Sequence, residues 1–470
     1  MAPAPDLCAL TLSEAASLVR ARKVSPVELT QACLRRIEKL GPALNAFITV
    51  TSELALEQAR AAEREIAHGR YRGPLHGIPI ALKDLIDTAG VRTTAASALF
   101  QDRVPTEDAT VVRRLKQAGA VLLGKTNLHE FAYGGSGTVS YYGAVRNPWA
   151  LEHIAGGSSS GSAAAVAAGM CFAALGTDTA GSIRLPAACC GIVGLKPTYG
   201  LVSGRGVIPL SRSYDHVGPM TRNVRDAAIV LQAISGYDAG DVTSREMPEE
   251  NYVAALDAGT SSLRLGIVRQ YFFDDLEPDV VAAINNALQV LETLTAGLSD
   301  ASMPIDTDRT VQSAEIYAYH AQFLGEHAGL YQPETLRRIQ RGETISAKDY
   351  ILKRSELEHL RRGAADLFCD YDLLVTPTSP APAPWLPELQ ANPEDLRRRE
   401  LVLLRNTRPF NVLGLPAVSV PCGFTGAGLP VGLQIAAAPG HDARVLQLAH
   451  AYEQATEWHK NNCRIVELQN

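Results

Sequence analysis

Apolar residues in the first 70 positions are spaced as in amphipathic helices. Capping boxes of the form Ser/Thr-x-x-Glu begin at Thr11 and Ser25, and the second is followed by proline at the first helical position. Residues 54–68 continue with apolar positions on one face, among alanines and glutamates. We therefore expect residues 1–70 to form a helical N-terminal segment.

Short continuous apolar runs follow this segment, as expected of buried strands. Helical patterns over residues 111–118 and 163–168 separate some of them. The strands are predicted at residues 78–82, 120–123, 372–376, 417–421 and 430–435, the last two as a hairpin. We find no internal repeat and no linker. The pattern indicates an α/β fold with a mixed, mostly parallel central β-sheet and helices on both faces.

We expect the whole chain, residues 1–470, to be a single domain. Residues 265–370 read as mostly helical and carry no motif, so we expect helices that shape a substrate pocket. The proline-rich segment TPTSPAPAPWLP at residues 376–387 predicts an extended surface loop or lid. After the N-terminal helices, the predicted parts are a core at 70–235, the helical region at about 265–370 and a C-terminal sheet portion at 371–470.

Composition excludes several classes of protein. A net charge of −6 leaves no basic excess for nucleic acid or an anionic membrane. No apolar run approaches the roughly 18 residues of a membrane span, and the N-terminus does not resemble a signal peptide. Eight cysteines without a C-x-x-C pair suit a reducing cytoplasm. The eleven histidines lack metal-site spacing, so we expect no metal and no cofactor.

Two serine-containing loops are the strongest chemical signal. They are GGSSSGS at residues 156–162 and DTAGSIR at residues 178–184. A serine hydroxyl needs a base to take its proton and donors to hold the oxyanion that forms during acyl transfer. Glycine reaches backbone conformations closed to other residues, so the loop around Ser182 can turn its N–H groups toward one point.

Lys83 supplies a candidate base. It lies in the apolar segment GIPIALKDLI at residues 77–86, where an ammonium must be paired, exposed at its tip or neutral. Asp84 is adjacent, and adjacent residues of a strand point to opposite faces, so Asp84 is a poor partner. A lysine whose head reaches water is the alternative for this segment alone. Together with the serine loops, a neutral catalytic lysine is favoured.

These three segments resemble the amidase signature family, whose members cleave C–N bonds. The likeness is strong over residues 70–235 and returns at 405–455, with FNVLGLPA at 410–417 and LPVGLQ at 429–434. The resemblance implies that Lys83 is the catalytic lysine, that Ser158 is a bridging serine after a cis peptide, and that Ser182 is the nucleophile.

The resemblance also implies roles for the neighbouring residues. The oxyanion hole would be formed by Thr179, Ala180, Gly181 and Ser182. Supporting residues would be Gly157, Ser159, Asp178 and Arg184, and substrate-binding residues would be Phe131, Tyr133, Gly134 and Thr177. Two positions depart from the family pattern, because Ser160 and Ala180 stand where glycine is usual. Alanine tolerates positive φ badly, which puts the geometry at Ala180 in question.

Three other interpretations are open. The segment GAVLLGKT at residues 119–126 matches a phosphate loop, but its interior reads as an apolar strand. The segment 157–161 fits the nucleophile elbow of an α/β-hydrolase esterase, with Ser159 as nucleophile and His441 or His450 as base. The chain could also be the amidase-like subunit of a glutamine-dependent amidotransferase or another assembly, inert alone.

The substrate is inferred from the residues expected near the pocket. Phe131, Tyr133, Tyr141 and Trp385 are aromatic, and no arginine or aspartate cluster is visible in the sequence. We therefore expect a broad amidase for neutral or aryl amides, with carbamates (urethanes) and esters as companions. His129 reads as a core histidine and Asp215 as a structural residue beside the site. A small-molecule substrate is the expected partner, for a monomer or homodimer.

Overall fold

The structure, a computed structural model, describes residues 6–461 and 463–467. Its centre is an 11-stranded sheet, whose strands lie side by side in the order β1-β3-β2-β4-β6-β5-β10-β11-β9-β7-β8. In that order the strands are Phe47–Val50, Val121–Thr126, Pro79–Lys83, Ala173–Thr177, Val217–Thr221, Val193–Lys196, Ala417–Phe424, Pro430–Ala436, Leu373–Pro377, Arg264–Val268 and Gly297–Ala301.

The sheet is mixed, as predicted. Within the described residues, β2 pairs in parallel with β3 and β4, and β7 with β8 and β9. The other six neighbouring pairs are antiparallel. The expectation of a mostly parallel sheet was therefore wrong in its proportion. The predicted hairpin β10–β11 is itself antiparallel, and β6, a strand that the prediction missed, adds antiparallel pairs with β4 and β5.

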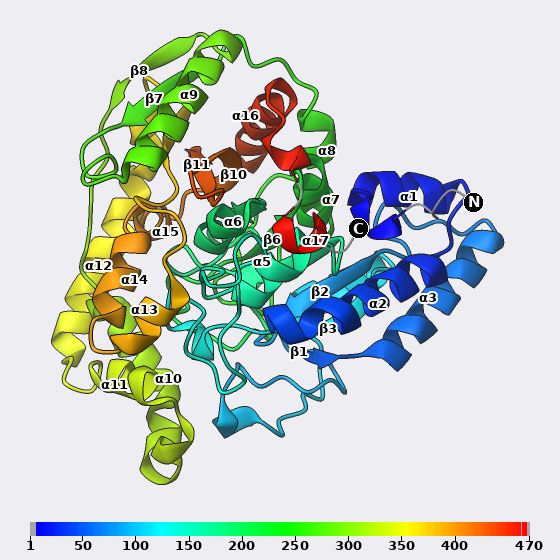
Figure 1. Ribbon diagram of the computed structural model, residues 1–470. Helices are drawn as coiled ribbons and strands as arrows, with labels where there is room; N and C mark the ends of the chain where they lie inside the picture. The colour runs from blue at the N-terminus through cyan, green and yellow to red at the C-terminus, as the bar shows by residue number, and fades with distance from the viewer. Residues whose placement is uncertain (1–5, 462, 468–470) are drawn as a thin grey trace.

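The N-terminal helices are as predicted. They are α1 (Leu12–Arg20), α2 (Pro26–Leu44) and α3 (Ser52–Ala67). Both capping boxes form. The hydroxyls of Thr11 and Ser25 accept a hydrogen bond from the backbone N–H of the glutamate three residues on, and the carboxylate of that glutamate accepts from the backbone N–H of the threonine or serine. Figure 1 shows these helices beside β1, β2 and β3, on the side of the molecule where both termini lie.

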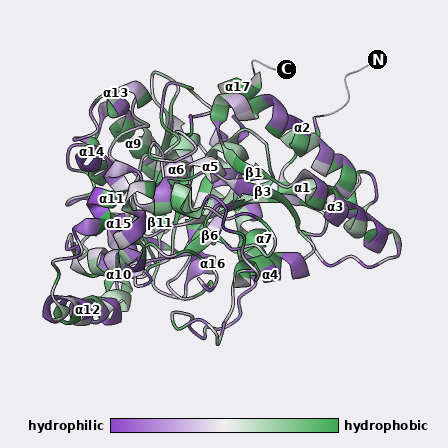
Figure 2. Ribbon diagram, turned by 90° about the horizontal axis from the view of Figure 1, so that it is seen from below, coloured by the Kyte–Doolittle hydropathy of each residue, from purple (hydrophilic) through white to green (hydrophobic). Residues whose placement is uncertain are grey.

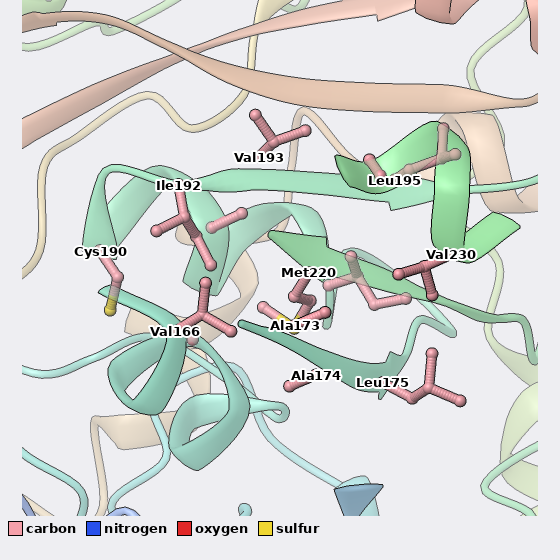
Figure 3. Close-up of a cluster of buried hydrophobic side chains, with 14 of the residues drawn as sticks. Val166, Ala173, Ala174, Leu175, Cys190, Ile192, Val193, Leu195, Met220 and Val230 are labelled. Atoms are coloured by element: carbon pink, nitrogen blue, oxygen red, sulfur yellow. The ribbon is translucent and has the colours of Figure 1, made fainter. Parts of the chain in front are cut away.

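Small apolar residues let the central helices pack closely on the sheet. These helices are α4 (Thr110–Gln117), α5 (Ser160–Ala167), α6 (Arg184–Cys190), α7 (Val224–Ile234) and α8 (Tyr252–Ala255). Figure 3 shows Val166 of α5, Met220 of β6 and Val230 of α7 packed around β4. This packing fixes α5 and α6, and the two serine loops directly precede these helices.

The region at 265–370 is mostly helical, as predicted. It contains α9 (Pro278–Leu294), α10 (Thr310–His327), α11 (Pro333–Gln340) and α12 (Ala347–Arg362). It also contains β8 and borders β7, two strands that the prediction missed. β8 is an edge strand with the polar sequence GLSDA, so it lacks the apolar run of a central strand.

The proline-rich segment is more enclosed than expected of a surface lid. Residues 376–380 are buried, and the segment is held by two backbone hydrogen bonds, from Ile154 N–H to the Pro384 carbonyl and from Leu386 N–H to the Glu152 carbonyl. The remaining helices are α13 (Leu386–Ala391), α14 (Leu396–Leu403), α15 (Arg408–Val412), α16 (Asp442–Ala455) and α17 (Arg464–Glu467).

Hydropathy follows this layering. In Figure 2 the inner strand β3 is green, whereas α12 at the periphery is largely purple. Leu357 is the one side chain of α12 that is fully buried. None of the helices in the described residues is long and apolar enough to cross a bilayer.

Candidate active site

Lys83 is the last residue of β2, and its side chain is completely buried. Its Nζ lies 2.7 Å from Ser158 Oγ, 2.9 Å from Ser159 Oγ and 2.8 Å from Thr177 Oγ1. Ser158 and Ser159 come just before α5, and Thr177 ends β4, which is the neighbour of β2 in the sheet. The pairing of two parallel strands therefore brings the lysine to the hydroxyls.

Hydrogen-bond accounting identifies the hydroxyl that can give a proton to Lys83. The hydroxyl of Ser159 donates to the Thr177 carbonyl and accepts from the Thr177 N–H, both at 3.2 Å. Its only proton is thus used, and it can only accept from Lys83. A neutral amine has two donors and one acceptor site. If Lys83 donates to Ser159 and Thr177, its lone pair is left for the hydroxyl of Ser158.

Burial makes a neutral Lys83 accessible near neutral pH. Desolvation lowers the pKa of Lys83 to about 7, against the opposing effect of the carboxylates of Asp178 and Asp215. No acidic side chain forms an ion pair with Lys83 within the described residues. The lysine therefore has the environment of a base rather than that of a structural cation.

Ser182 lies in the loop between β4 and α6. Its side chain is 5% exposed, and within the described residues its hydroxyl has no hydrogen-bond partner. The two serine loops touch, because the Ser159 N–H donates to the Ser182 carbonyl at 3.2 Å. The Gly157–Ser158 peptide bond is cis. The loop that carries the unpartnered Ser182 hydroxyl therefore lies against the Ser158–Ser159 segment.

Four backbone N–H groups around Ser182 were expected to form the oxyanion hole, and three of them are free within the described residues. The Gly181 N–H donates to Asp178 Oδ1 at 2.7 Å, so it is not available to an oxyanion in this structure. The N–H groups of Thr179, Ala180 and Ser182 make no hydrogen bond with any described residue. The expectation that Gly181 donates is therefore corrected, since the local turn directs its N–H to the aspartate.

Ser160 and Ala180, which stand where the family usually has glycine, do not strain the backbone. Gly181 has a φ of +133°, whereas Ala180 is not among the residues with positive φ. A Cβ on Gly181 would also lie 2.0 Å from Thr407 Oγ1. Ser160 begins α5 and likewise has no positive φ. The position that requires glycine is thus Gly181, and alanine is compatible with position 180.

A buried ion pair holds the Ser182 loop. Asp178 and Arg184 are completely buried and 3.0 Å apart. Asp178 also accepts from the N–H groups of Gly181 and Ile183 and from the amide of Asn411. The guanidinium and these donors hold the pKa of Asp178 well below its usual range, although burial opposes this. Asp178 is therefore a permanent anion around which the loop folds.

The segment after His129 packs against the serine loop. The His129 N–H donates to the Ser158 carbonyl at 3.1 Å, and a Cβ on Gly157 would meet backbone of Gly134, Gly135 and Gly137. A Cβ on Gly134 would itself collide with the ring of His129. Tyr133, at 5% exposure, retains a small open surface. This segment is hereafter the Tyr133 loop, residues 129–137.

The other aromatic candidates are placed differently. Phe131 is 1% exposed, and its ring lies 4.6 Å from that of His320 and 5.5 Å from that of Tyr331. It is thus part of a buried aromatic cluster and does not line an open surface, which corrects its predicted role in binding. Tyr141 and Trp385 are about half exposed.

Two residues that hold the Tyr133 loop were not found from the sequence. Arg338 of α11 donates to the Tyr133 carbonyl at 2.5 Å and to Glu400 of α14 at 2.7 Å. Glu400 accepts from the hydroxyl of Ser136 at 2.6 Å. Both charged side chains are 1% exposed. They clamp the Tyr133 loop, and no local pattern joins residues so far apart in the chain.

The remaining candidates have structural surroundings. Asp215 accepts from the hydroxyl of Thr179 and from the N–H groups of Leu210 and Ser211. His129 is fully buried, and desolvation lowers its pKa to about 3. Both agree with the expected structural roles. Residues 119–126 form mainly the strand β3, so this segment has no phosphate-binding loop.

The geometry also argues against Ser159 as the nucleophile of an α/β-hydrolase elbow. The hydroxyl of Ser159 is buried, and its partners are Lys83 and Thr177, with no histidine among them in the described residues. His441 is exposed at the start of α16, and His450 lies within that helix. No cluster of three potential metal ligands occurs in the described part of the chain.

Comparisons with known proteins identify the family of this chain. A family model described as Amidase matches residues 28–446. The A subunit of the glutamyl-tRNA(Gln) amidotransferase from Moorella thermoacetica is 43% identical, over 97% of this chain and 98% of that protein. The crystal structure of the corresponding protein from Thermotoga maritima has 36% identity and a TM-score of 0.80, covering 97% and 96% of the two chains. A peptide amidase bound to the inhibitor chymostatin has 34% identity and a TM-score of 0.85, covering 97% and 99%.

Proposed function

The chain belongs to the amidase signature family of enzymes, and from that premise we propose that it hydrolyses carboxylic amides with Ser182 as the nucleophile. The observation that carries the proposal is the 2.7 Å contact of Lys83 Nζ with Ser158 Oγ beside the open hydroxyl of Ser182. In this scheme, neutral Lys83 takes a proton from Ser158 while Ser158 takes the proton of Ser182.

The proton transfers accompany attack of Ser182 Oγ on the amide carbonyl carbon. The carbonyl oxygen becomes an oxyanion, for which the free N–H groups of Thr179, Ala180 and Ser182 are the available donors. The C–N bond then breaks, and Ser158 passes a proton to the departing amine. Water attacks the resulting acyl-enzyme by the same route, which releases the carboxylic acid and regenerates Ser182. The scheme uses no cofactor.

A second candidate function is supported by the relatives. Several of them are named as the A subunit of glutamyl-tRNA(Gln) amidotransferase, with 40–43% identity over nearly the whole of both chains. We therefore propose, as the more specific alternative, that this chain is the amide-hydrolysing subunit of a glutamine-dependent amidotransferase. None of the compared relatives supports the carbamate and ester activities that the sequence suggested.

An amide panel tests both proposals. Purified chain is given glutamine, a short aliphatic amide, an acyl p-nitroanilide and an aryl carbamate, with Ser182→Ala as control. Release of ammonia or amine that depends on Ser182 supports hydrolysis, and its absence from every amide contradicts it. Full activity of the isolated chain on simple amides would count against the subunit role. Light scattering on the same sample tests the expected monomer or homodimer.

A further inference from the structure

Two arginines beside the Tyr133 loop are poorly paired. Arg397 of α14 has a side-chain exposure of 12%, and within the described residues its guanidinium donates no hydrogen bond. Its nearest acid is Glu400, 3.8 Å away. Glu400 is already engaged by Arg338 and Ser136. A largely buried guanidinium with five unused donors has a strong requirement for an acceptor.

Arg309 is in a similar position, directly before α10. It donates to Gln312 at 3.2 Å and forms no ion pair with any described residue. Burial, together with the charges of Arg408 and Arg397, lowers the pKa of Arg309 to about 9. The Tyr133 side chain acts in the opposite direction and raises this pKa. Arg309 is thus within electrostatic range of Arg408 and Arg397.

Direct contacts connect this region to the nucleophile loop. The Arg397 guanidinium lies 5.3 Å from the centre of the Tyr133 ring. Arg408 binds the carbonyls of Asp306 and Asp308, the residues just before Arg309. Its neighbour Thr407 donates to the Ala180 carbonyl at 2.6 Å. The arginines therefore approach the Ser182 loop from the side of α14 and α15.

A single residue links the two loops on this side. Leu404 lies one turn beyond Glu400 and contacts both loops. A Cβ added to Gly135 would lie 3.0 Å from its side chain, and a Cβ added to Gly181 would lie 2.9 Å from it. The Tyr133 loop and the Ser182 loop thus face the same leucine. Leu404 directly follows α14, the helix that carries Arg397, so the end of this helix lies against both loops.

We propose that Arg397 and Arg309 bind a carboxylate carried by the amide substrate, on the Tyr133 side of Ser182. This rests on the proposed amide hydrolysis and names its substrate class. A guanidinium binds a carboxylate with two parallel hydrogen bonds, and the low-polarity surroundings strengthen them. The ligand would also remove the repulsion between neighbouring arginines. A neutral aryl amide, which the sequence favoured, leaves these donors unpaired.

The test compares amides that differ only in the carboxylate. Succinamate, glutaramate and adipamate are each paired with the neutral amide in which an isopropyl group replaces the carboxylate. We expect at least one carboxylate amide to have a kcat/KM at least tenfold above its neutral match. Arg397→Met should lower that value at least tenfold, mainly through KM, and leave the neutral match within twofold.

The matched control is Arg398→Met, because Arg398 is adjacent on α14, has a side-chain exposure of 72% and pairs with Asp395. It should change neither substrate. Arg397→Lys keeps the charge and lacks the two-pronged geometry, so it should recover only part of the preference. A wild-type preference for every neutral amide, or an equal loss on both members of a pair in Arg397→Met, overturns the proposal.

Binding without turnover separates this inference from the proposed function. Calorimetry of the carboxylate amides is performed on Ser182→Ala and on Ser182→Ala/Arg397→Met. We expect saturable binding to the first and at least tenfold weaker binding to the second. If the wild type hydrolyses no amide but this difference holds, the hydrolytic proposal fails and the carboxylate site stands. Equal binding to both variants overturns the site whatever the activity.

Discussion

Lys83 Nζ lies 2.7 Å from Ser158 Oγ, and 75 positions of the chain separate the two residues. The contact is made inside the protein, where both side chains are completely buried. Ser159 occupies a second donor of the same lysine and has no proton left for it. The direction of proton transfer thus follows from the hydrogen bonds that surround the pair.

Removing the Ser182 hydroxyl should abolish turnover without unfolding the chain. We expect Ser182→Ala to lower kcat on the order of 10⁶-fold, as for other serine nucleophiles, with an unchanged thermal midpoint. A fluorophosphonate should label Ser182 in the wild type, as read by peptide mass spectrometry. Label on Ser159 would contradict the scheme.

Activity should depend on pH through Lys83. Because the lysine must be unprotonated to act as a base, and burial lowers its pKa to about 7, activity should be low in acid, rise through about pH 7 and level off above it. Lys83→Ala should cost about 10²–10⁴-fold in kcat. Lys83→Arg should not restore activity, because guanidinium stays protonated. A pH profile without an acid limb would argue against this role.

Ser158 and Ser159 should respond differently to alanine. Ser158→Ala removes the hydroxyl between Lys83 and Ser182, so we expect a loss of about 10²–10⁴-fold in kcat. Ser159→Ala removes an acceptor for Lys83 Nζ and two contacts with Thr177, and about tenfold is expected from loss of ordinary hydrogen bonds. Steady-state kinetics on one amide measures both losses of kcat. A larger loss in Ser159→Ala than in Ser158→Ala would favour the esterase elbow.

Substitutions at Gly181 and Ala180 provide a matched test of the backbone geometry around Ser182. A Cβ on Gly181 would meet Thr407 Oγ1 at 2.0 Å, and its φ of +133° is closed to alanine. Gly181→Ala should displace the loop and cost about 10²–10³-fold in kcat, as the loss of an oxyanion donor does. Ala180→Gly should stay within about twofold, since Ala180 has no positive φ. Similar losses in both variants would refute the geometric argument.

Breaking the Arg338–Glu400 pair should destabilise the protein. Arg338→Met removes the cation that lies 2.7 Å from the buried Glu400 and leaves only Arg397, 3.8 Å away, so we expect a loss of up to about 3–5 kcal/mol in the free energy of unfolding. The double variant Arg338→Met/Glu400→Met removes both charges and should recover part of this loss. Urea denaturation followed by fluorescence provides the comparison. A single variant as stable as the wild type would show that the clamp contributes nothing.

The sequence alone determined the family of this protein and much of its local structure. The capping boxes at Thr11 and Ser25 form as expected because a cap depends on residues three apart. The strand predicted at residues 78–82 is likewise found as β2, which ends one residue later at Lys83. Short-range signals of this kind identified the lysine and both serine loops.

The tertiary structure alone decided how these parts meet. It directs the Gly181 N–H to Asp178, makes alanine acceptable at position 180, and buries Phe131 in an aromatic cluster. It also places Arg397 beside Tyr133, where the sequence showed no charged cluster. These relationships join residues from separate strands and helices. Sheet order and helix packing set them, and no pattern along the chain carries that information.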